Sequence, residues 1–337
     1  MHVTSSNRRP RALGLVLTAA ALLATACPRT RNTPSSSPSP ASGGTPTGAV
    51  RATLSPITLP SPRYRTTGAA LGGNVYVLGG LDAGGAPAAD VYRIEPPKAK
   101  AGPAGRLSTP TQGGAAVPLG SRVLVFGGAG AAPLDLVQQF EPTTGATSVV
   151  GHLPGPRADA AATSVGNEIL VLGGFDGSAP ASDVLATADG TSFHKVGSLK
   201  VAVRDPAVAV VGTTVYLFGG LVSGEPYRGT FATAVQSYNI TTGLSKVAGN
   251  LPTPLAHARA AVIGGQVLVM GGWSPSGPSS AILRFDVTSG GLSPAGMLPG
   301  PVAGEAAAVI GDTAYLAGGI AERPLTRVEV VSTAPGP

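Results

Sequence analysis

Six copies of one short pattern run along the chain, and in each copy an apolar run ends in two glycines. The copies are 75–80 (VYVLGG), 123–128 (VLVFGG), 169–174 (ILVLGG), 215–220 (VYLFGG), 267–272 (VLVMGG) and 314–319 (AYLAGG). Their first glycines follow one another at steps of 48, 46, 46, 52 and 47 residues. Self-similarity at such a period predicts a row of similar structural units that bury their apolar faces against one another.

Two further positions keep the same register in all six copies. Seven residues before each first glycine lies another glycine: Gly72, Gly120, Gly166, Gly212, Gly264 and Gly311. Twenty residues before it lies a leucine: Leu59, Leu107, Leu153, Leu199, Leu251 and Leu298. Each copy is therefore free of insertions across twenty residues.

The spacing predicts four strands in each unit. The earlier glycine lies between two apolar runs, where a tight hairpin turn can require positive φ. The run before the double glycine shows no polar alternation, which indicates a strand buried on both faces. A third strand recurs at 91–92, 137–140, 235–238 and 282–285, and a fourth ends at the leucine. Sheets stacked radially around an axis bury strands in this way.

The two ends of the repeat array complement each other. Residues 51–57 lead into Leu59 with no earlier strands before them, and the sixth double glycine is followed only by 326–331 as a third strand. We expect the N-terminal strand to supply the missing fourth strand of the last blade, which removes two open sheet edges. The predicted fold is all-β, a six-bladed β-propeller of four-stranded antiparallel blades.

Residues 51–333 resemble a kelch-repeat β-propeller. The double glycines carry the resemblance, together with a later aromatic position filled by Tyr92, Phe140, Tyr238 and Phe285, whereas the family's later tryptophan is absent from every copy. By fold-level analogy, the resemblance implies a ligand at the mouth of the central channel, on the face formed by the loops into each innermost strand and after each second strand.

One repeat position supplies most of the candidate site residues. Fourteen residues before the double glycines lie Arg65, Gly113, Asp159, Asp205, His257 and Gly304, and Arg63, Arg157, Arg204, Arg259 and Glu305 lie close by. We expect a ring of mixed charge at the mouth, suited to hydroxyls, carboxylates or the polar groups of a peptide. For any single arginine, hydrogen bonding to loop carbonyls between blades is an equal alternative.

Two aromatic features fall on the same face. Trp273 directly follows Gly272 and is expected to contact a ligand or to pack between blades. The loop 221–237 is longer than its counterparts and carries Glu225, Tyr227, Arg228 and Phe231, which we expect to overhang the mouth.

Charge and composition exclude several classes of function. The formal net charge of +6 comes from six basic residues before residue 52, which leaves 17 basic and 17 acidic residues in the rest of the chain. A neutral body argues against nucleic-acid binding, which needs clustered Lys and Arg on the folded domain. After the leader only His152, His194 and His257 remain, and no catalytic or zinc-binding motif occurs. We expect no metal and no cofactor.

The N-terminal segment has the pattern of an export signal. Arg8, Arg9 and Arg11 precede an uncharged stretch, 12–26, which is too short to span a bilayer as a helix. The sequence around Cys27 (LATAC) resembles the lipobox of bacterial lipoproteins, in which the cysteine is acylated. We therefore expect a signal peptide over 1–26, a flexible Ser/Pro-rich tether over 27–50 and a short tail over 334–337. An ordinary signal peptide with an incidental thiol is the alternative.

Three functions are compatible with these observations. The first is a lipid-anchored, extracytoplasmic binding module for a protein or glycan at the channel mouth, acting as a monomer and in contact with the membrane only through acylated Cys27. The second is a carbohydrate-active enzyme resembling the exported sialic acid mutarotases, which needs only one acid-base pair, from Asp159, Asp205, His257 or Glu305. The third is a structural role in the cell envelope.

The lipid anchor predicts where a cysteine variant will be found. Cys27→Ser removes the acceptor of the acyl chains, and each buried methylene of those chains adds about 0.8 kcal/mol to membrane binding. We expect the variant to leave the membrane fraction, as measured by fractionation and immunoblotting. A variant that stays with the membrane would show that Cys27 is not the anchor.

Overall fold

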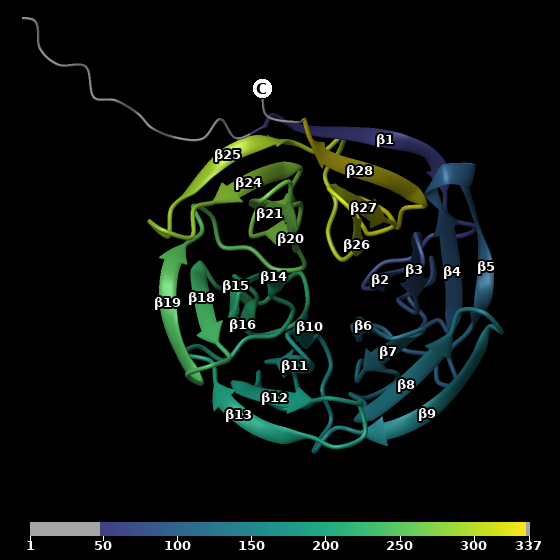
Figure 1. Cartoon of the computed structure of the whole chain (residues 1–337). Coiled ribbons are helices and arrows are strands. Elements are labelled where there is room, and N and C mark those ends of the chain that lie inside the picture. Colours follow the sequence, from purple (N-terminus) through teal and green to yellow (C-terminus); the bar gives the residue numbers. More distant parts are fainter. Residues whose placement is uncertain (1–47, 335–337) are drawn as a thin grey trace, which may run out of the picture. The chain divides into compact units, whose positions relative to one another are not determined.

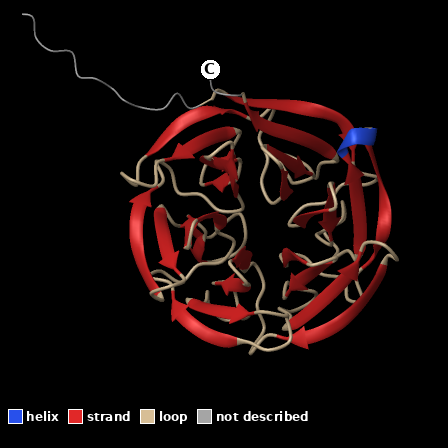
Figure 2. Ribbon diagram, in the orientation of Figure 1, coloured by secondary structure: helices blue, strands red, loops and turns tan. Residues whose placement is uncertain are grey.

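The computed structural model describes residues 48–334 as six four-stranded antiparallel sheets around a central axis (Figure 1). This confirms the predicted all-β propeller of six blades. Blades 1 to 5 run outward from the axis in chain order, and blade 6 does so for its first three strands, with β1 (Val50–Thr58) from the start of the propeller outermost. Within these residues the one helical element is the short 3-10 turn η1 (Pro96–Lys98), shown in blue in Figure 2.

The strands follow the predicted unit in every blade. Blade 1 contains β2 (Thr67–Leu71), β3 (Asn74–Leu78), β4 (Asp90–Glu95) and β5 (Lys100–Arg106); blade 2 contains β6 (Ala115–Leu119), β7 (Arg122–Phe126), β8 (Leu136–Glu141) and β9 (Ala146–His152); blade 3 contains β10 (Ala161–Val165), β11 (Glu168–Leu172), β12 (Asp183–Thr187) and β13 (His194–Ser198). Blade 4 contains β14 (Ala207–Val211), β15 (Thr214–Phe218), β18 (Ala234–Asn239) and β19 (Leu244–Asn250); blade 5 contains β20 (Arg259–Ile263), β21 (Gln266–Met270), β24 (Ala281–Phe285) and β25 (Leu292–Met297); blade 6 contains β26 (Ala306–Ile310), β27 (Thr313–Ala317), β28 (Arg327–Thr333) and β1 (Val50–Thr58). Two small hairpins, β16 (Leu221–Ser223) with β17 (Thr230–Phe231) and β22 (Trp273–Ser274) with β23 (Gly277–Pro278), stand in the loops of blades 4 and 5.

The double glycines join each blade to the next. The amide of every second glycine donates a hydrogen bond of 2.7–2.9 Å to a carbonyl of the following blade. The acceptors, in blade order, are the carbonyls of Thr111, Arg157, Val203, Leu255, Val302 and Arg63. Every first glycine has φ between 58° and 72°, and a Cβ there would collide with the same carbonyl. The pair of glycines is therefore required both by the backbone conformation and by the close approach of the next blade.

The hydrophobic core lies between the blades. Buried apolar residues form six clusters, and each cluster combines side chains from two consecutive blades, the sixth joining blade 6 to blade 1. The second strands of blades 1, 2, 3 and 5 are buried on both faces, as their lack of polar alternation predicted, whereas those of blades 4 and 6 each keep one half-buried tyrosine, Tyr216 and Tyr315. The six leucines that keep register with the double glycines are all buried in these interfaces or at their edges.

The first strand closes the ring, as predicted. β1 pairs antiparallel with β28 at the rim of blade 6, with Val50 opposite Thr333 and Ala52 opposite Val331 (Figure 1). The two ends of the described chain also meet, because the amide of Ala334 donates to the carbonyl of Ala49 at 2.9 Å. Blade 6 is thereby a complete four-stranded sheet made from both ends of the repeat array.

One prediction about the aromatic position is wrong. Tyr92 lies opposite Val77, whereas Phe140 lies opposite Val123, so Tyr92 is two residues out of register with the other aromatics and Ile94 takes their position. The physical reason is loop length, because the loop after the first double glycine is two residues longer than the loop after the second. Tyr92 and Phe140 both lie twelve residues after the second glycine of their blades, so the sequence alone did not show that their positions in the strand differ.

The N-terminal expectations lie outside the described residues. The signal peptide over 1–26, Cys27, nearly all of the tether over 27–50, and residues 335–337 of the tail belong to this part of the chain. In the described part, no helix is long and apolar enough to cross a membrane.

A matched pair of glycine variants tests the role of the double glycine. Gly173 and Gly166 both have φ of +62°, but a Cβ at Gly173 would collide with the carbonyl of Val203, and at Gly166 it would meet nothing within 4 Å. Gly166→Ala should lower the free energy of unfolding by about 1 kcal/mol, the cost of left-handed backbone, and Gly173→Ala by about 3 kcal/mol or more. Urea denaturation measures both, and equal losses would show that the contact between blades contributes nothing.

Candidate functional site

A belt of six hydrogen-bonded residues surrounds the axis at the point where the chain enters each innermost strand. Its members are the residues at the shared repeat position: Arg65, Gly113, Asp159, Asp205, His257 and Gly304. From blade 2 to blade 6, each member donates its amide to the carbonyl of its counterpart in the preceding blade, over 2.6–3.3 Å. The amide of Thr66 completes the circle by donating to the carbonyl of Gly304 at 3.2 Å. The belt therefore fixes six chain segments at equal depth in the channel.

The backbone of the belt is left-handed in all six blades, with φ between 49° and 63°. Glycine satisfies this conformation in blades 2 and 6, at Gly113 and Gly304. The other four members are Arg, Asp, Asp and His, and such residues rarely adopt positive φ unless the surrounding structure imposes it. Strained residues of this kind cluster at functional sites.

One group of charges lies on the side of blades 1, 3 and 4. Arg65 forms a buried ion pair with Asp159, with 2.7 Å between Nη2 and Oδ1, and its Nε donates to Gln112. Arg204 approaches the other oxygen of Asp159 at 3.8 Å, and its guanidinium lies over the ring of Phe175 at 4.4 Å from the centroid. Asp159 is thus held between two arginines.

A second group lies on the side of blades 4 and 5. Asp205 contacts Nδ1 of His257 through one carboxylate oxygen and Nη1 of Arg259 at 3.5 Å through the other. Burial acts to raise the pKa of Asp205, but attraction to His257, Arg259 and Arg65 outweighs it and holds this pKa well below its usual value. Arg259 is fixed in turn by the carbonyls of Glu305 and Thr66.

Four of these charged side chains line a cavity of about 150 Å³ in the channel: Arg65, Asp159, Asp205 and Arg259. The rest of its wall consists of small residues of the innermost strands, among them Thr67, Gly68, Ala116 and Ala162. The side chain of Arg259 is 21% exposed and that of Asp205 is 13% exposed, whereas Asp159 is 1% exposed. Arg259 and Asp205 are therefore the charges most available to a ligand.

Of the four residues of the long loop in blade 4 that were expected to overhang the mouth, Tyr227 lies against one side of the belt. Tyr227, between β16 and β17, has its ring centroid 4.3 Å from that of His257 and 4.8 Å from that of Trp273. Its hydroxyl lies beside Gly304, is buried and makes no hydrogen bond. Burial raises the pKa of Tyr227, so the phenol keeps its proton. Of the other three candidates in this loop, Glu225 and Arg228 are exposed.

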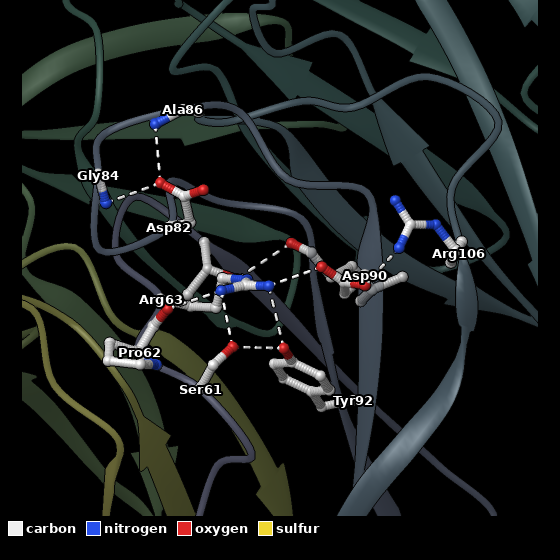
Figure 3. Close-up of polar contacts among 11 residues, drawn as sticks. Ser61, Pro62, Arg63, Asp82, Gly84, Ala86, Asp90, Tyr92 and Arg106 are labelled. Carbon is white, nitrogen blue, oxygen red and sulfur yellow. Dashed lines mark hydrogen bonds and ion pairs between the residues drawn. The ribbon is translucent and has the colours of Figure 1, made fainter.

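The structure separates Arg63 and Arg157 from the ring of charges. Arg63 bonds to Asp90 at 2.6 Å and to the hydroxyl of Tyr92 at 2.9 Å, and it also donates to Ser61 and to the carbonyl of Pro62 (Figure 3). Arg157 donates to the carbonyl of Gly173 and lies 3.6 Å from Asp183. These two arginines bond mainly within the blade that their loop enters. The alternative that the sequence left open, hydrogen bonding to loop carbonyls, also holds for Arg259 and Arg204, which donate to the carbonyls of Glu305, Thr66 and Gly224.

Glu305 is also withdrawn from the mouth. It follows Gly304 in the chain, is fully buried, and packs its Cβ close to Gly319, while neither carboxylate oxygen has a hydrogen-bond partner. Burial raises the pKa of Glu305 to about 7, against a weaker opposite effect of Arg259. The side chain is therefore neutral over much of the acidic range.

Sequence reasoning missed two residues of the site, Gln112 and Phe175. Phe175 directly follows the third double glycine, which is the repeat position that Trp273 occupies in blade 5, so the same count would have found it. Gln112 directly precedes the belt member Gly113. Over residues 48–334, no group of three or more His, Cys, Asp or Glu side chains is placed to hold a metal ion.

Comparison with known proteins agrees with this architecture. A model described as Kelch motif matches residues 156–186, which span the entry loop and first strands of blade 3. The solved structure of YjhT superimposes with a TM-score of 0.70 at 15% sequence identity, over 81% of this chain and 96% of the YjhT chain. No curated protein matches the sequence. The chain thus carries a Kelch motif within a six-bladed propeller fold.

Glu305 predicts a pH-dependent stability. Its pKa is about 7 in the folded protein and 4.5 ordinarily, so the folded state holds a proton that the unfolded state releases as pH rises from 4.5 to 7. The contribution of this proton is present below pH 4.5 and is lost above pH 7. Glu305→Gln should therefore be more stable than the natural protein at pH 8, by about 3 kcal/mol at most, and similar to it at pH 4.5. Urea denaturation at both pH values measures the difference, and a constant difference would contradict the assignment.

Proposed function

We propose that the protein is a binding module that holds a protein or glycan ligand through a polar, negatively charged group at the belt. The supporting observation is the strain at the shared repeat position. Glycine fits there in two blades, yet four blades carry Arg65, Asp159, Asp205 and His257 in left-handed conformation. A position that merely shaped the channel would favour glycine in every blade. We infer that in these four blades the side chain itself has a function that offsets the strain of the backbone.

The charge balance favours an acidic group on the ligand. Three guanidinium groups, of Arg65, Arg204 and Arg259, face two carboxylates, of Asp159 and Asp205. Among these five side chains, one positive charge is therefore uncompensated. A carboxylate of a sugar acid or of a peptide would balance it, and Arg259, the most exposed of the three, would be its first partner.

Tyr227 adds a hydrogen-bond donor that the free protein does not use. Its buried hydroxyl has no partner, and a buried unsatisfied polar group destabilises a protein unless something bonds to it. A ligand oxygen at the belt would accept this hydrogen bond once the loop moves, because the hydroxyl is buried and Tyr227 does not line the cavity. The overhanging loop would then contribute directly to the choice of ligand.

The cellular location belongs to the same proposal. A signal peptide over 1–26 and an acylated Cys27 would hold the propeller outside the cytoplasm, on a membrane. This rests on the N-terminal sequence pattern alone.

A carbohydrate-active enzyme is the second candidate, and the contact between Asp205 and His257 favours it. A carboxylate on one nitrogen of an imidazole orients the ring for proton transfer at the other nitrogen. However, Nε2 of His257 is buried beneath Tyr227, so this candidate requires the loop to move. An enzyme would lose turnover in His257→Gln while it keeps ligand binding, as measured by NMR of the sugar anomers.

Tyr227→Phe tests the binding proposal directly. We expect the variant to unfold at the same denaturant concentration as the natural protein or a higher one, because it loses a hydroxyl without a partner. We expect its affinity for the ligand to fall about fivefold, since one hydrogen bond is worth about 1 kcal/mol. The ligand is chosen from an array of neutral and uronic-acid glycans and from peptides with a free carboxyl end, and affinity is measured by calorimetry.

Tyr315→Phe, on β27 away from the belt, is the matched control and should bind as the natural protein does. Unchanged affinity in Tyr227→Phe would remove the overhanging loop from the site. The absence of any acidic glycan or peptide ligand from both screens would contradict the proposed function itself.

A further inference from the structure

One space that recurs in every blade is filled by different kinds of side chain in different blades. We call it the slot: the space between the loop that leads into a blade and the third strand of that blade. Four residues form its corners. Two lie in the entering loop, eighteen and sixteen residues before the first glycine of the double glycine, and two are the first and third residues of the third strand. A comparison of the six slots shows where one blade departs from the others.

Charged or phenolic side chains fill the slot in three blades. In blade 1 Arg63 and Tyr92 bond to each other and to Ser61 (Figure 3). In blade 3 Arg157 spans it toward Asp183. In blade 6, at the rim beside β1, Arg327 pairs with Glu329 at 2.6 Å and donates to the carbonyl of Pro301 at 2.9 Å.

Glutamine fills the slot in two further blades, with the same geometry in both. In blade 2 the side chain of Gln138 accepts from the amide of Thr109 and donates to its carbonyl, at 2.8 and 3.1 Å. In blade 4 Gln236 does the same with Val201, at 2.7 and 3.0 Å. Each glutamine satisfies the backbone of the entering loop and occupies the space beside it.

Blade 5 has no such side chain. Its corners are Thr253, Leu255, Ala281 and Leu283, and Leu283 stands where blades 2 and 4 have glutamine. All four corners line a cavity of about 370 Å³. For comparison, an apolar cavity of roughly 150 Å³ is enough to hold one benzene molecule, and small-molecule sites begin at roughly 300 Å³.

The wall of this cavity has an apolar side and a hydroxyl side. Leu255, Val269, Ala281 and Leu283 form the apolar side, and no charged residue lines the cavity. Ser274, Ser276 and Ser279, on and beside the hairpin β22–β23, face it from the loop after the double glycine. Ser274 is buried and donates to the carbonyl of Gly277 at 3.0 Å. The hydroxyl oxygens of the loop can still accept from a ligand.

We propose that this cavity, which we call the blade 5 pocket, binds an uncharged small molecule with an apolar body and a hydroxyl or carbonyl group at one end. The apolar body would lie against Leu255 and Leu283, and the polar end would face the serines. A charged group is excluded because nothing in the wall could pair with it, and an unpaired buried charge is strongly unfavourable. This site is separate from the belt, which selects for charge.

The test uses 2-naphthol as the probe and 2-naphthoate as its charged counterpart. Calorimetry on the full chain should show 2-naphthol binding with a dissociation constant of about 0.1 mM or lower. 2-Naphthoate should bind this pocket at least about tenfold more weakly. Equal affinity of the two probes for the blade 5 pocket would overturn the proposal, as would no binding of 2-naphthol.

Two substitutions taken from other blades of the same chain locate the binding. Leu283→Gln introduces the residue of blades 2 and 4 and should fill the pocket by bonding to the backbone of Thr253. Ala281→Leu introduces the residue that blade 2 has at this position, Leu136. Each should weaken 2-naphthol at least about tenfold, while Leu244→Gln, an exposed site on β19, should not change it.

Thermal unfolding of each variant shows whether it folds. If Leu283→Gln does not fold, Ala281→Leu provides the same test. Unchanged 2-naphthol affinity in either folded pocket variant would place the binding elsewhere and overturn the proposal. Any binding of 2-naphthoate that persists in Leu283→Gln would belong to the positively charged belt.

Discussion

The fold depends on a single contact repeated six times: the amide of one glycine donates to a carbonyl of the neighbouring blade, and the glycine before it leaves room for that carbonyl. The contact is short, directional and made by backbone, so it tolerates almost any side chain around it. Hydrophobic burial between consecutive blades supplies most of the stabilisation. The glycine contact sets how closely and at what angle two blades meet, and six equal contacts close a circle.

The equal contacts between blades also determine the structure around the central channel. Because every blade enters its innermost strand at the same depth, one repeat position supplies six segments that can bond to one another as a belt. Variation at that position places arginine, aspartate and histidine side chains against one another without any change in the frame. A single longer loop then covers one side, through Tyr227 on His257 and Trp273. The site therefore arises from different side chains at one repeat position and from one longer loop, while the backbone geometry of the repeats stays the same.

The sequence predicted the number of blades, their strands and the closure, because glycines at constant spacing report backbone requirements that no other residue meets. It located the belt members by their constant distance from the double glycines, although only two of the six are glycine. It did not separate Arg63 and Arg157 from the belt. They precede the belt members by two residues, and in an extended strand the two side chains would point the same way. The belt member is itself left-handed, which breaks that alternation. The blade 5 pocket also left no local signal, because Leu283 by itself is not unusual. Blade 3 has Leu185 at the same position, but there Arg157 fills the slot, whereas blade 5 has Leu255 in place of the arginine.

The closure of blade 6 has a consequence for how the molecule is made. β1 is the earliest strand of the propeller to be synthesised, and its partner β28 is the last. Until β28 has been made, β1 has no strand to pair with, and its unpaired edge could pair with another chain. Pairs so distant along the polypeptide form slowly. The strand that closes the ring is therefore also the one whose edge stays unpaired longest during synthesis.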